Sequence, residues 1–213
     1  MTGGLRILIV DDHPIVRHGL KQTLADAADV GEICEAANGH EALDLVRQRD
    51  WDAVVLDIGL PGRGGIDILK DIKRERPRLP VLILSMHPED QYAIRALRAG
   101  AGGYLTKEAA TEKLLEAIRR IIAGRRFISP DLAERLAFEL TEDNAGPPHA
   151  SLSDREFEVL RLIATGLAAG DIAERLSLSV KTVSTYRARI LEKMRMKNNA
   201  ELMQYVLTNR LIE

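Results

Sequence analysis

The feature of this sequence that most constrains its fold is a regular alternation of short apolar runs with amphipathic segments. The apolar runs lie at 5–10, 32–37, 53–57, 81–85 and 102–106. The segments that follow them carry apolar residues at helical spacing, at 14–26, 40–49, 66–75, 89–99 and 111–123. Parallel neighbouring strands need a crossover, which is usually a helix. Five strand–helix units therefore predict an α/β domain with a doubly wound, five-stranded parallel sheet.

Polar residues stand where these predicted strands end. They are Asp11 and Asp12 after the first run, Asp57 at the third, Ser85 at the fourth, and Thr106 and Lys107 at the fifth. In doubly wound sheets the ligand site lies at the carboxyl ends of the strands, so we expect these groups to meet there. Three crowded carboxylates repel one another without a cation, and oxygen-only ligands favour Mg²⁺. With Lys107 beside it, such a site suits a carboxylate that accepts a phosphoryl group, and Asp57 ends the most buried strand.

Each of these residues also has an ordinary structural explanation. An aspartate after a strand usually caps a helix or makes a turn, and Ser85 can cap the helix that follows it. Lys107 taken alone is a typical solvated surface lysine. The conjunction of chemically compatible groups at four of the five strand ends favours a shared functional site.

The pattern changes after Gly124. Residues 124–150 form an expected linker with a helix at 130–142, and 144–150 reads as a flexible tether. Beyond it every pattern is helical, at 154–165, 170–176, 180–194 and 199–208. We therefore predict two domains, at 5–123 and 151–213, the second all-α.

The second domain has the order of a helix-turn-helix. A short helix is followed by a turn at 177–179 and by a longer helix with an apolar stripe. The open side of that helix carries Lys181, Ser184, Thr185, Ala188 and Arg189. Six basic residues and a single acidic one lie between 181 and 197, although the whole chain has a net charge of −2. The small side chains suit a major groove and the cations suit phosphates; a solvated basic face on a small bundle is the alternative.

The first domain resembles the receiver domain of response regulators. The resemblance rests on Asp11 and Asp12, the segment Asp-Ile-Gly-Leu-Pro-Gly-Arg-Gly-Gly from Asp57, Ser85, and Tyr-Leu-Thr-Lys ending at Lys107. It implies a flavodoxin-like fold and phosphorylation of Asp57 by a sensor histidine kinase. Leu60 departs from the family, which often has Met at this position.

The resemblance also assigns roles within the pocket. Asp12, Asp57 and the backbone carbonyl of Gly59 would bind Mg²⁺ directly, and Asp11 would act through bound water. Lys107 would hold the phosphoryl group. Ser85 and Tyr104 match the switch pair, in which the hydroxyl moves toward the phosphoryl group and the aromatic ring swings inward.

The second domain resembles the LuxR-type helix-turn-helix, on the stretch from Leu152 to Tyr186. The family implies groove contacts for Ser184, Thr185 and Ala188, and contacts to the DNA backbone for Lys181, Thr182 and Arg189. Asn198-Asn199 stands where the family usually has Asn-Arg, at the cost of one phosphate or scaffold contact.

Together the two domains resemble the NarL/FixJ class of response regulators. This predicts a non-enzymatic transcription regulator that binds double-stranded promoter DNA as a homodimer when Asp57 is phosphorylated, with RNA polymerase as a candidate further partner. The dimer surface would be either 111–123 with the first helix around Val16 and Leu20, or the 89–106 face. We expect a cytoplasmic protein, since the sequence has no export signal or apolar run of membrane-spanning length.

Two other functions compete with this prediction. A DNA-binding regulator with a vestigial receiver would not depend on phosphorylation. A phosphatase with an aspartyl nucleophile would need a second acid–base carboxylate beside Asp57, and Gly59 stands two residues on.

Overall fold

The chain folds into two compact units. This computed structural model describes residues 4–61, 64–86, 89–141, 147–209 and 211–212. The units are Met1–Glu134 and Arg135–Glu213, and the boundary falls inside helix α6 (Pro130–Thr141). Among the described helices, none combines the length and the apolar character that crossing a bilayer requires.

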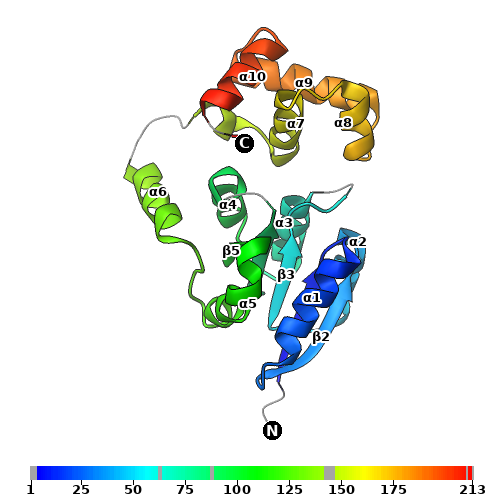
Figure 1. Cartoon of the computed structure of the whole chain (residues 1–213), viewed down its shortest axis with the longest axis vertical. Helices are drawn as coiled ribbons and strands as arrows, with labels where there is room; N and C mark the ends of the chain where they lie inside the picture. Colours follow the sequence, from blue (N-terminus) through cyan, green and yellow to red (C-terminus); the bar gives the residue numbers. More distant parts are fainter. Residues whose placement is uncertain (1–3, 62–63, 87–88, 142–146, 210, 213) are drawn as a thin grey trace. The chain divides into compact units, whose positions relative to one another are not determined.

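The first unit is built on the parallel sheet that the sequence predicts. Its strands are β1 (Leu5–Val10), β2 (Val30–Ala36), β3 (Ala53–Asp57), β4 (Val81–Ser85) and β5 (Gly103–Thr106). They pair in the order β2-β1-β3-β4-β5 and every pair is parallel (Figure 1). The order reverses between β1 and β3, and the carboxyl ends of strands at such a switch point form the usual ligand site.

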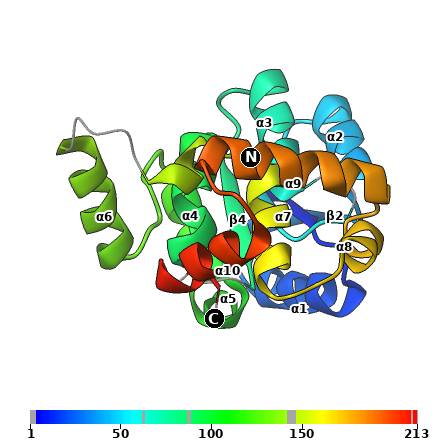
Figure 2. The same ribbon diagram turned by 90° about the horizontal axis from the view of Figure 1, so that it is seen from above.

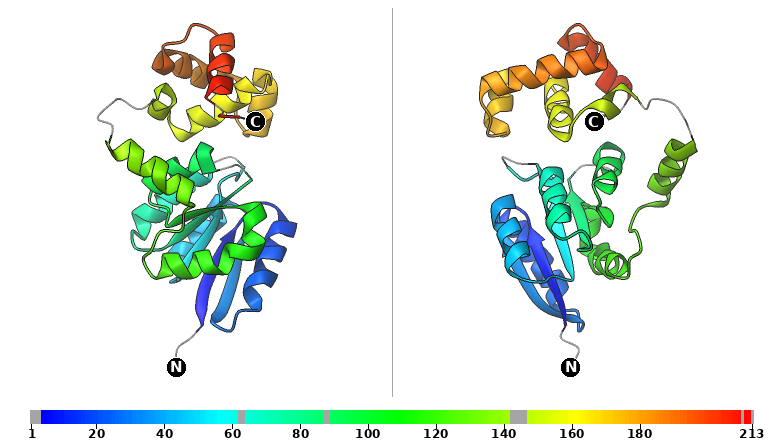
Figure 3. Two further views of the ribbon diagram at one scale, coloured as in Figure 1. Left: turned by 60° about the vertical axis from the view of Figure 1, so that its left-hand side comes forward. Right: turned by 180° about the vertical axis from the view of Figure 1, so that it is seen from behind.

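Helices cover both faces of this sheet. They are α1 (Pro14–Ala25), α2 (Gly39–Gln48), α3 (Gly65–Glu75), α4 (Glu89–Arg98) and α5 (Lys107–Ile122). α1 packs against α5, whereas α3 packs against both α2 and α4 (Figure 3). Ile7 and Ile9 join Leu114 of α5 in one core cluster, and Leu8, which points to the opposite face, is equally buried. Burial on both faces explains why the strands read as continuous apolar runs.

Two elements, β2 and α5, start more than one residue away from the positions that the sequence predicts. β2 starts at Val30 instead of residue 32, because its backbone pairs with β1 from Leu5 onward despite the interruption at Gly31. α5 starts at Lys107 instead of residue 111, because Thr106 caps it: its side-chain oxygen accepts a hydrogen bond from the Ala109 amide at 3.4 Å. Thr106 is therefore a helix cap at the pocket edge.

The start of the expected linker is bound to the sheet. Phe127 forms a parallel bridge with Gly103, the Tyr104 amide donates to the Phe127 carbonyl at 3.0 Å, and the Phe127 amide donates to Gly102 at 3.1 Å. A Cβ at Gly103 would lie 2.6 Å from the Phe127 carbonyl oxygen, so this close approach needs glycine. The predicted tether at 144–150 is also partly structured, since Pro148–Ser151 form a 3₁₀ turn, while 144–146 lie outside the described residues.

The second unit contains a small helical bundle. Its helices are α7 (Asp154–Ala164), α8 (Ala169–Arg175), α9 (Val180–Met194) and α10 (Asn199–Thr208) (Figure 2). α7 packs against α9 and α10, and α8 packs against α9. Ser153 and Glu156 form a reciprocal capping box at the start of α7, and Gly166 has the positive φ (83°) that ends it.

One residue proposed for a dimer surface is not available for it. Leu20 is only 7% exposed and belongs to the core cluster, and Val16 packs partly against the same cluster. Helical periodicity cannot tell the core side of α1 from a second apolar side, which is why the sequence left this open. A surface on α1 would have to use other side chains, such as the exposed Ile15.

The packing predicts how the first unit responds to loss of a core side chain. Leu114→Ala should lower its free energy of unfolding by about 2–5 kcal/mol, because Leu114 is fully buried and a cavity would remain. Denaturant unfolding can be followed by Trp51, the single tryptophan, which is buried in this unit. Ile15→Ala is the matched control, and an equal loss in both variants would contradict the assigned core.

Candidate functional site

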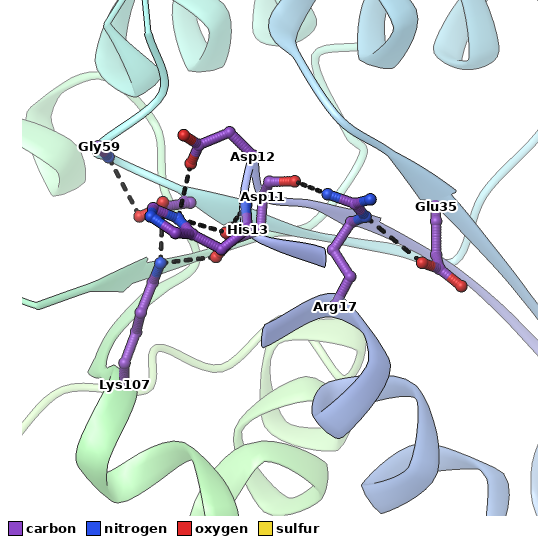
Figure 4. Close-up of polar contacts among 8 residues, drawn as sticks. Asp11, Asp12, His13, Arg17, Glu35, Gly59 and Lys107 are labelled. Atoms are coloured by element: carbon purple, nitrogen blue, oxygen red, sulfur yellow. Dashed lines mark hydrogen bonds and ion pairs between the residues drawn. The ribbon is translucent and has the colours of Figure 1, made fainter. Parts of the chain in front are cut away.

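The strand ends at the switch point bring two aspartates and a lysine into direct contact. Asp11 follows β1, Asp57 ends β3, and Lys107 opens α5. The Lys107 Nζ atom lies 2.6 Å from Asp11 Oδ2 and 2.9 Å from Asp57 Oδ2 (Figure 4). Both carboxylates are buried, with Asp11 1% and Asp57 3% exposed. β1 and β3 are neighbours in the sheet, and this adjacency brings together residues 46 positions apart in the sequence.

The charges of this cluster depend on one another. Burial raises the pKa of Asp57 above its ordinary value, and the hydrogen bond from Lys107 opposes that shift. Burial lowers the pKa of Lys107, but hydrogen bonds to Asp11 and Asp57 outweigh it, so the net pKa is raised. Lys107 therefore remains a cation at neutral pH and offsets part of the cost of the buried carboxylates.

Asp12 lies on the solvent side of the pocket. Its side chain is 29% exposed, and its buried Oδ1 atom accepts no hydrogen bond, although His13 Nδ1 lies 2.9 Å away. One ligand atom from each of Asp11, Asp12, His13 and Asp57 falls within 4.8 Å of the others. A hard divalent cation binds to oxygen ligands that carry excess negative charge. This cluster supplies both, and it includes a carboxylate oxygen, Asp12 Oδ1, that accepts no hydrogen bond. The residues present therefore fit Mg²⁺.

Gly59 and Gly65 shape the backbone around Asp57. The Gly59 amide donates to Asp57 Oδ1 at 3.1 Å, which leaves the assignment of its carbonyl to the metal as a prediction. A Cβ at Gly65 would lie 2.3 Å from the Asp57 carbonyl oxygen, so α3 can start this close to the strand only with glycine.

Ser85 and Tyr104 are both fully buried. Ser85 is the register partner of Thr106 and lies one residue beyond Leu84, the partner of Asp57. Its position at the same edge as Asp57 therefore agrees with the sequence prediction. Tyr104 lies in β5 with its ring inside the domain.

Two neighbours of the pocket were missed by sequence reasoning. The His13 amide donates to Asp11 Oδ1 at 2.8 Å, and its ring nitrogen lies beside both Asp11 and Asp12. Arg17 donates from Nη1 to the Asp11 carbonyl oxygen at 2.6 Å and from Nε to Glu35 at 3.4 Å, so it joins the ends of β1 and β2 (Figure 4). The place of His13 directly after the two aspartates was the available signal; nothing in the sequence pairs Arg17 with Glu35.

The second unit presents the predicted face of α9. Val183, Ile190 and Met194 are buried and Tyr186 is half-buried. All five residues predicted for the open side are exposed, and Thr182 is intermediate. Ser179 caps α9 by accepting from the Thr182 amide at 3.1 Å. The hydroxyls of Ser184 and Thr185 donate to helix carbonyl oxygens one turn back, at 3.0 Å each.

Two basic side chains of the stretch 181–197, Arg187 and Lys193, contact other helices of the second unit. Lys193 pairs with the buried Glu156 at 2.6 Å. Arg187 donates to Asn199 Oδ1 at 2.6 Å, and Asn198 caps α10. Asn198 and Asn199 therefore each make a contact within the fold, and the contact expected to be lost with the family's Arg at position 199 stays a prediction. The Arg187 and Lys193 side chains are nevertheless exposed, as are Lys181, Arg189, Arg195 and Lys197.

Comparison with known proteins identifies both units. Residues 7–119 match the family described as response regulator receiver domain, and residues 150–206 match bacterial regulatory proteins of the luxR family. Response regulator GacA of Pseudomonas aeruginosa is 37% identical over 199 residues, which cover 93% of each chain. Response regulator UvrY of Escherichia coli K12 is 35% identical and covers 93% of this chain and 91% of its own.

A solved structure extends the likeness to a complex with DNA. RcsB from Salmonella enterica serovar Typhimurium, bound to promoter rprA in the presence of phosphomimetic BeF₃⁻, is 26% identical. The match has a TM-score of 0.64 and covers 95% of this chain and 98% of RcsB.

The raised pKa of Asp57 predicts a pH-dependent effect of its removal. Because burial raises the pKa of Asp57 in the folded state, ionisation of this carboxyl group destabilises the fold. The free energy of unfolding of the wild type therefore falls as the pH rises through the folded-state pKa of Asp57. Without divalent cations, Asp57→Asn should therefore unfold at higher denaturant than the wild type at pH 7. The difference should shrink toward pH ~4, near the ordinary carboxyl pKa. Trp51 fluorescence reports the transition.

Asp50→Asn serves as the control, since the Asp50 side chain is 84% exposed. A gain for Asp57→Asn that does not change with pH would show that the buried charge of Asp57 is not its cause.

Proposed function

The chain belongs to the two-component response regulators of the NarL/FixJ class, which join a receiver domain to a LuxR-type DNA-binding domain, and we propose that a phosphoryl group on Asp57 switches its activity. It is a DNA-binding transcription regulator of the phosphorylation-dependent kind. The observation that carries the assignment of Asp57 is the buried contact of its carboxylate with Lys107 at the switch point of the sheet.

The proposed transfer uses groups that the pocket already holds in place. An oxygen of Asp57 attacks the phosphorus of a phosphohistidine on the sensor kinase. The phosphorus–nitrogen bond breaks, and its electron pair leaves with the donor imidazole. The Lys107 Nζ atom lies 2.9 Å from Asp57 Oδ2. It can donate a charge-assisted hydrogen bond to an oxygen of the phosphoryl group once that group is on Asp57.

The carboxylates support a role for Mg²⁺ in this step. Asp12 and Asp57 would hold the ion directly with the Gly59 carbonyl, and Asp11 through water. When bound, the ion supplies positive charge that neutralises the oxygens of the transferring group. The unsatisfied Oδ1 atom of Asp12 supports this assignment.

Output requires a change at the receiver to reach DNA binding. We assign Ser85 and Tyr104 as the switch pair and a phosphorylation-dependent homodimer as the DNA-binding form. One bundle of 63 residues offers a small surface to a duplex, and two half-sites roughly double it. Ser184, Thr185 and Ala188 would contact bases, and Lys181, Thr182 and Arg189 the DNA backbone. RNA polymerase as a partner and a cytoplasmic location remain predictions.

The phosphoacceptor can be tested by intact mass. After incubation with Mg²⁺ and acetyl phosphate, the wild type and the control Asp50→Asn should each gain one phosphoryl group, and Asp57→Asn should gain none. Labelling of Asp57→Asn would overturn the assignment. Absence of labelling on the wild type, also with a sensor kinase as donor, would favour the competing function, a vestigial receiver on a phosphorylation-independent regulator.

The DNA interface can be tested through salt dependence. Lys181→Ala should weaken binding to all promoter sequences and reduce the slope of log K against log salt by about 1, because one phosphate contact is lost. Lys113→Ala, an exposed lysine of the first unit, should leave the slope unchanged. If Lys181→Ala affects one operator alone, Lys181 reads bases instead.

A further inference from the structure

We propose that His13 supplies a nitrogen ligand to the divalent cation of the pocket, so that this site favours first-row transition ions such as Mn²⁺ over Mg²⁺. The inference rests on the metal site of the proposed function and concerns one residue that the site does not otherwise use. Imidazole nitrogen suits transition ions, whereas carboxylate, carbonyl and water oxygens suit Mg²⁺.

The position of the ring carries the proposal. His13 Nδ1 lies 2.9 Å from Asp12 Oδ1 and 3.3 Å from Asp11 Oδ1. Two adjacent ligands of an octahedral ion, each about 2.1 Å from it, lie about 3.0 Å apart. The ring nitrogen and the Asp12 oxygen therefore have the spacing of neighbouring positions around one ion, and Asp57 offers a third atom within the same 4.8 Å cluster.

The backbone holds His13 in this position. Pro14 follows it, and a residue before proline is restricted to extended conformations, as observed with φ −87° and ψ 112°. The His13 amide is fixed by its hydrogen bond to Asp11 Oδ1 at 2.8 Å. Although His13 occupies the N-cap position of α1, its side chain makes no capping hydrogen bond. The His13 side chain is 65% exposed, so it lies at the solvent side of the pocket.

A protonated His13 that forms ion pairs with Asp11 and Asp12 would give the same distances. In that case the ring would compete with the cation, and its removal would strengthen metal binding. The two arrangements therefore differ in the sign of the effect of His13→Ala.

The experiment compares the full-length wild type, His13→Ala and the control His18→Ala, an exposed histidine of α1. Calorimetry gives the dissociation constants of Mn²⁺ and Mg²⁺ at about pH 8, above the ordinary imidazole pKa of about 6.5. Electron spin echo spectroscopy of bound Mn²⁺ detects a coordinated imidazole nitrogen directly. We expect that coupling in the wild type and in His18→Ala, and its loss in His13→Ala. The same variant should bind Mn²⁺ at least about tenfold more weakly, with little change for Mg²⁺.

Each other outcome has a distinct meaning. Absence of the nitrogen coupling in the wild type, or an unchanged or improved Mn²⁺ affinity in His13→Ala, would overturn the role of His13 while the Mg²⁺ site stands. If the wild type binds neither ion, or if Asp12→Asn binds Mg²⁺ as well as the wild type does, the proposed metal site fails and the inference fails with it.

Discussion

The contact of the Lys107 ammonium with Asp11 and Asp57 is the interaction on which the first unit's site depends. Both carboxylates are almost completely buried, and Asp57 has a raised pKa because of it. A buried ion pair of this kind is weak evidence for stability, since desolvation offsets much of its attraction. Its role here is to fix positions. The Lys107 ammonium holds the ends of β1 and β3 together and stays within hydrogen-bond distance of Asp57, the proposed phosphoacceptor.

The arrangement of the sheet makes that contact available and also limits what can surround it. Parallel strands covered on both faces leave only their ends for polar chemistry, so the pocket residues lie at or next to the carboxyl ends of strands. The segment around Phe127 contacts the sheet next to a proposed switch residue. The Tyr104 amide donates to the Phe127 carbonyl, so β5 is hydrogen-bonded to the chain that leads toward the second unit.

In the second unit, the helix ends are set by local sequence, whereas one charge contact depends on how the helices pack. The capping box at Ser153, the cap at Ser179 and the stop at Gly166 are local, and each could be predicted from a few residues of sequence. The use of Lys193 by the buried Glu156 could not, because those residues come from helices α9 and α7. Counting charges along the sequence therefore overstated the basic surface that remains for DNA.

The sequence by itself determined the sheet, its helices and the strand-end residues, because hydrophobic periodicity and helix caps are encoded locally and parallel strands allow few topologies. It also placed Asp11, Asp57 and Lys107 at one edge, since strand ends in such sheets converge. Only the tertiary structure decided which oxygens Lys107 contacts, that His13 turns toward the two carboxylates, that Arg17 reaches the Asp11 carbonyl, and that Phe127 pairs with β5. Those outcomes depend on side-chain packing and on register between segments far apart in the chain, which no short stretch of sequence specifies.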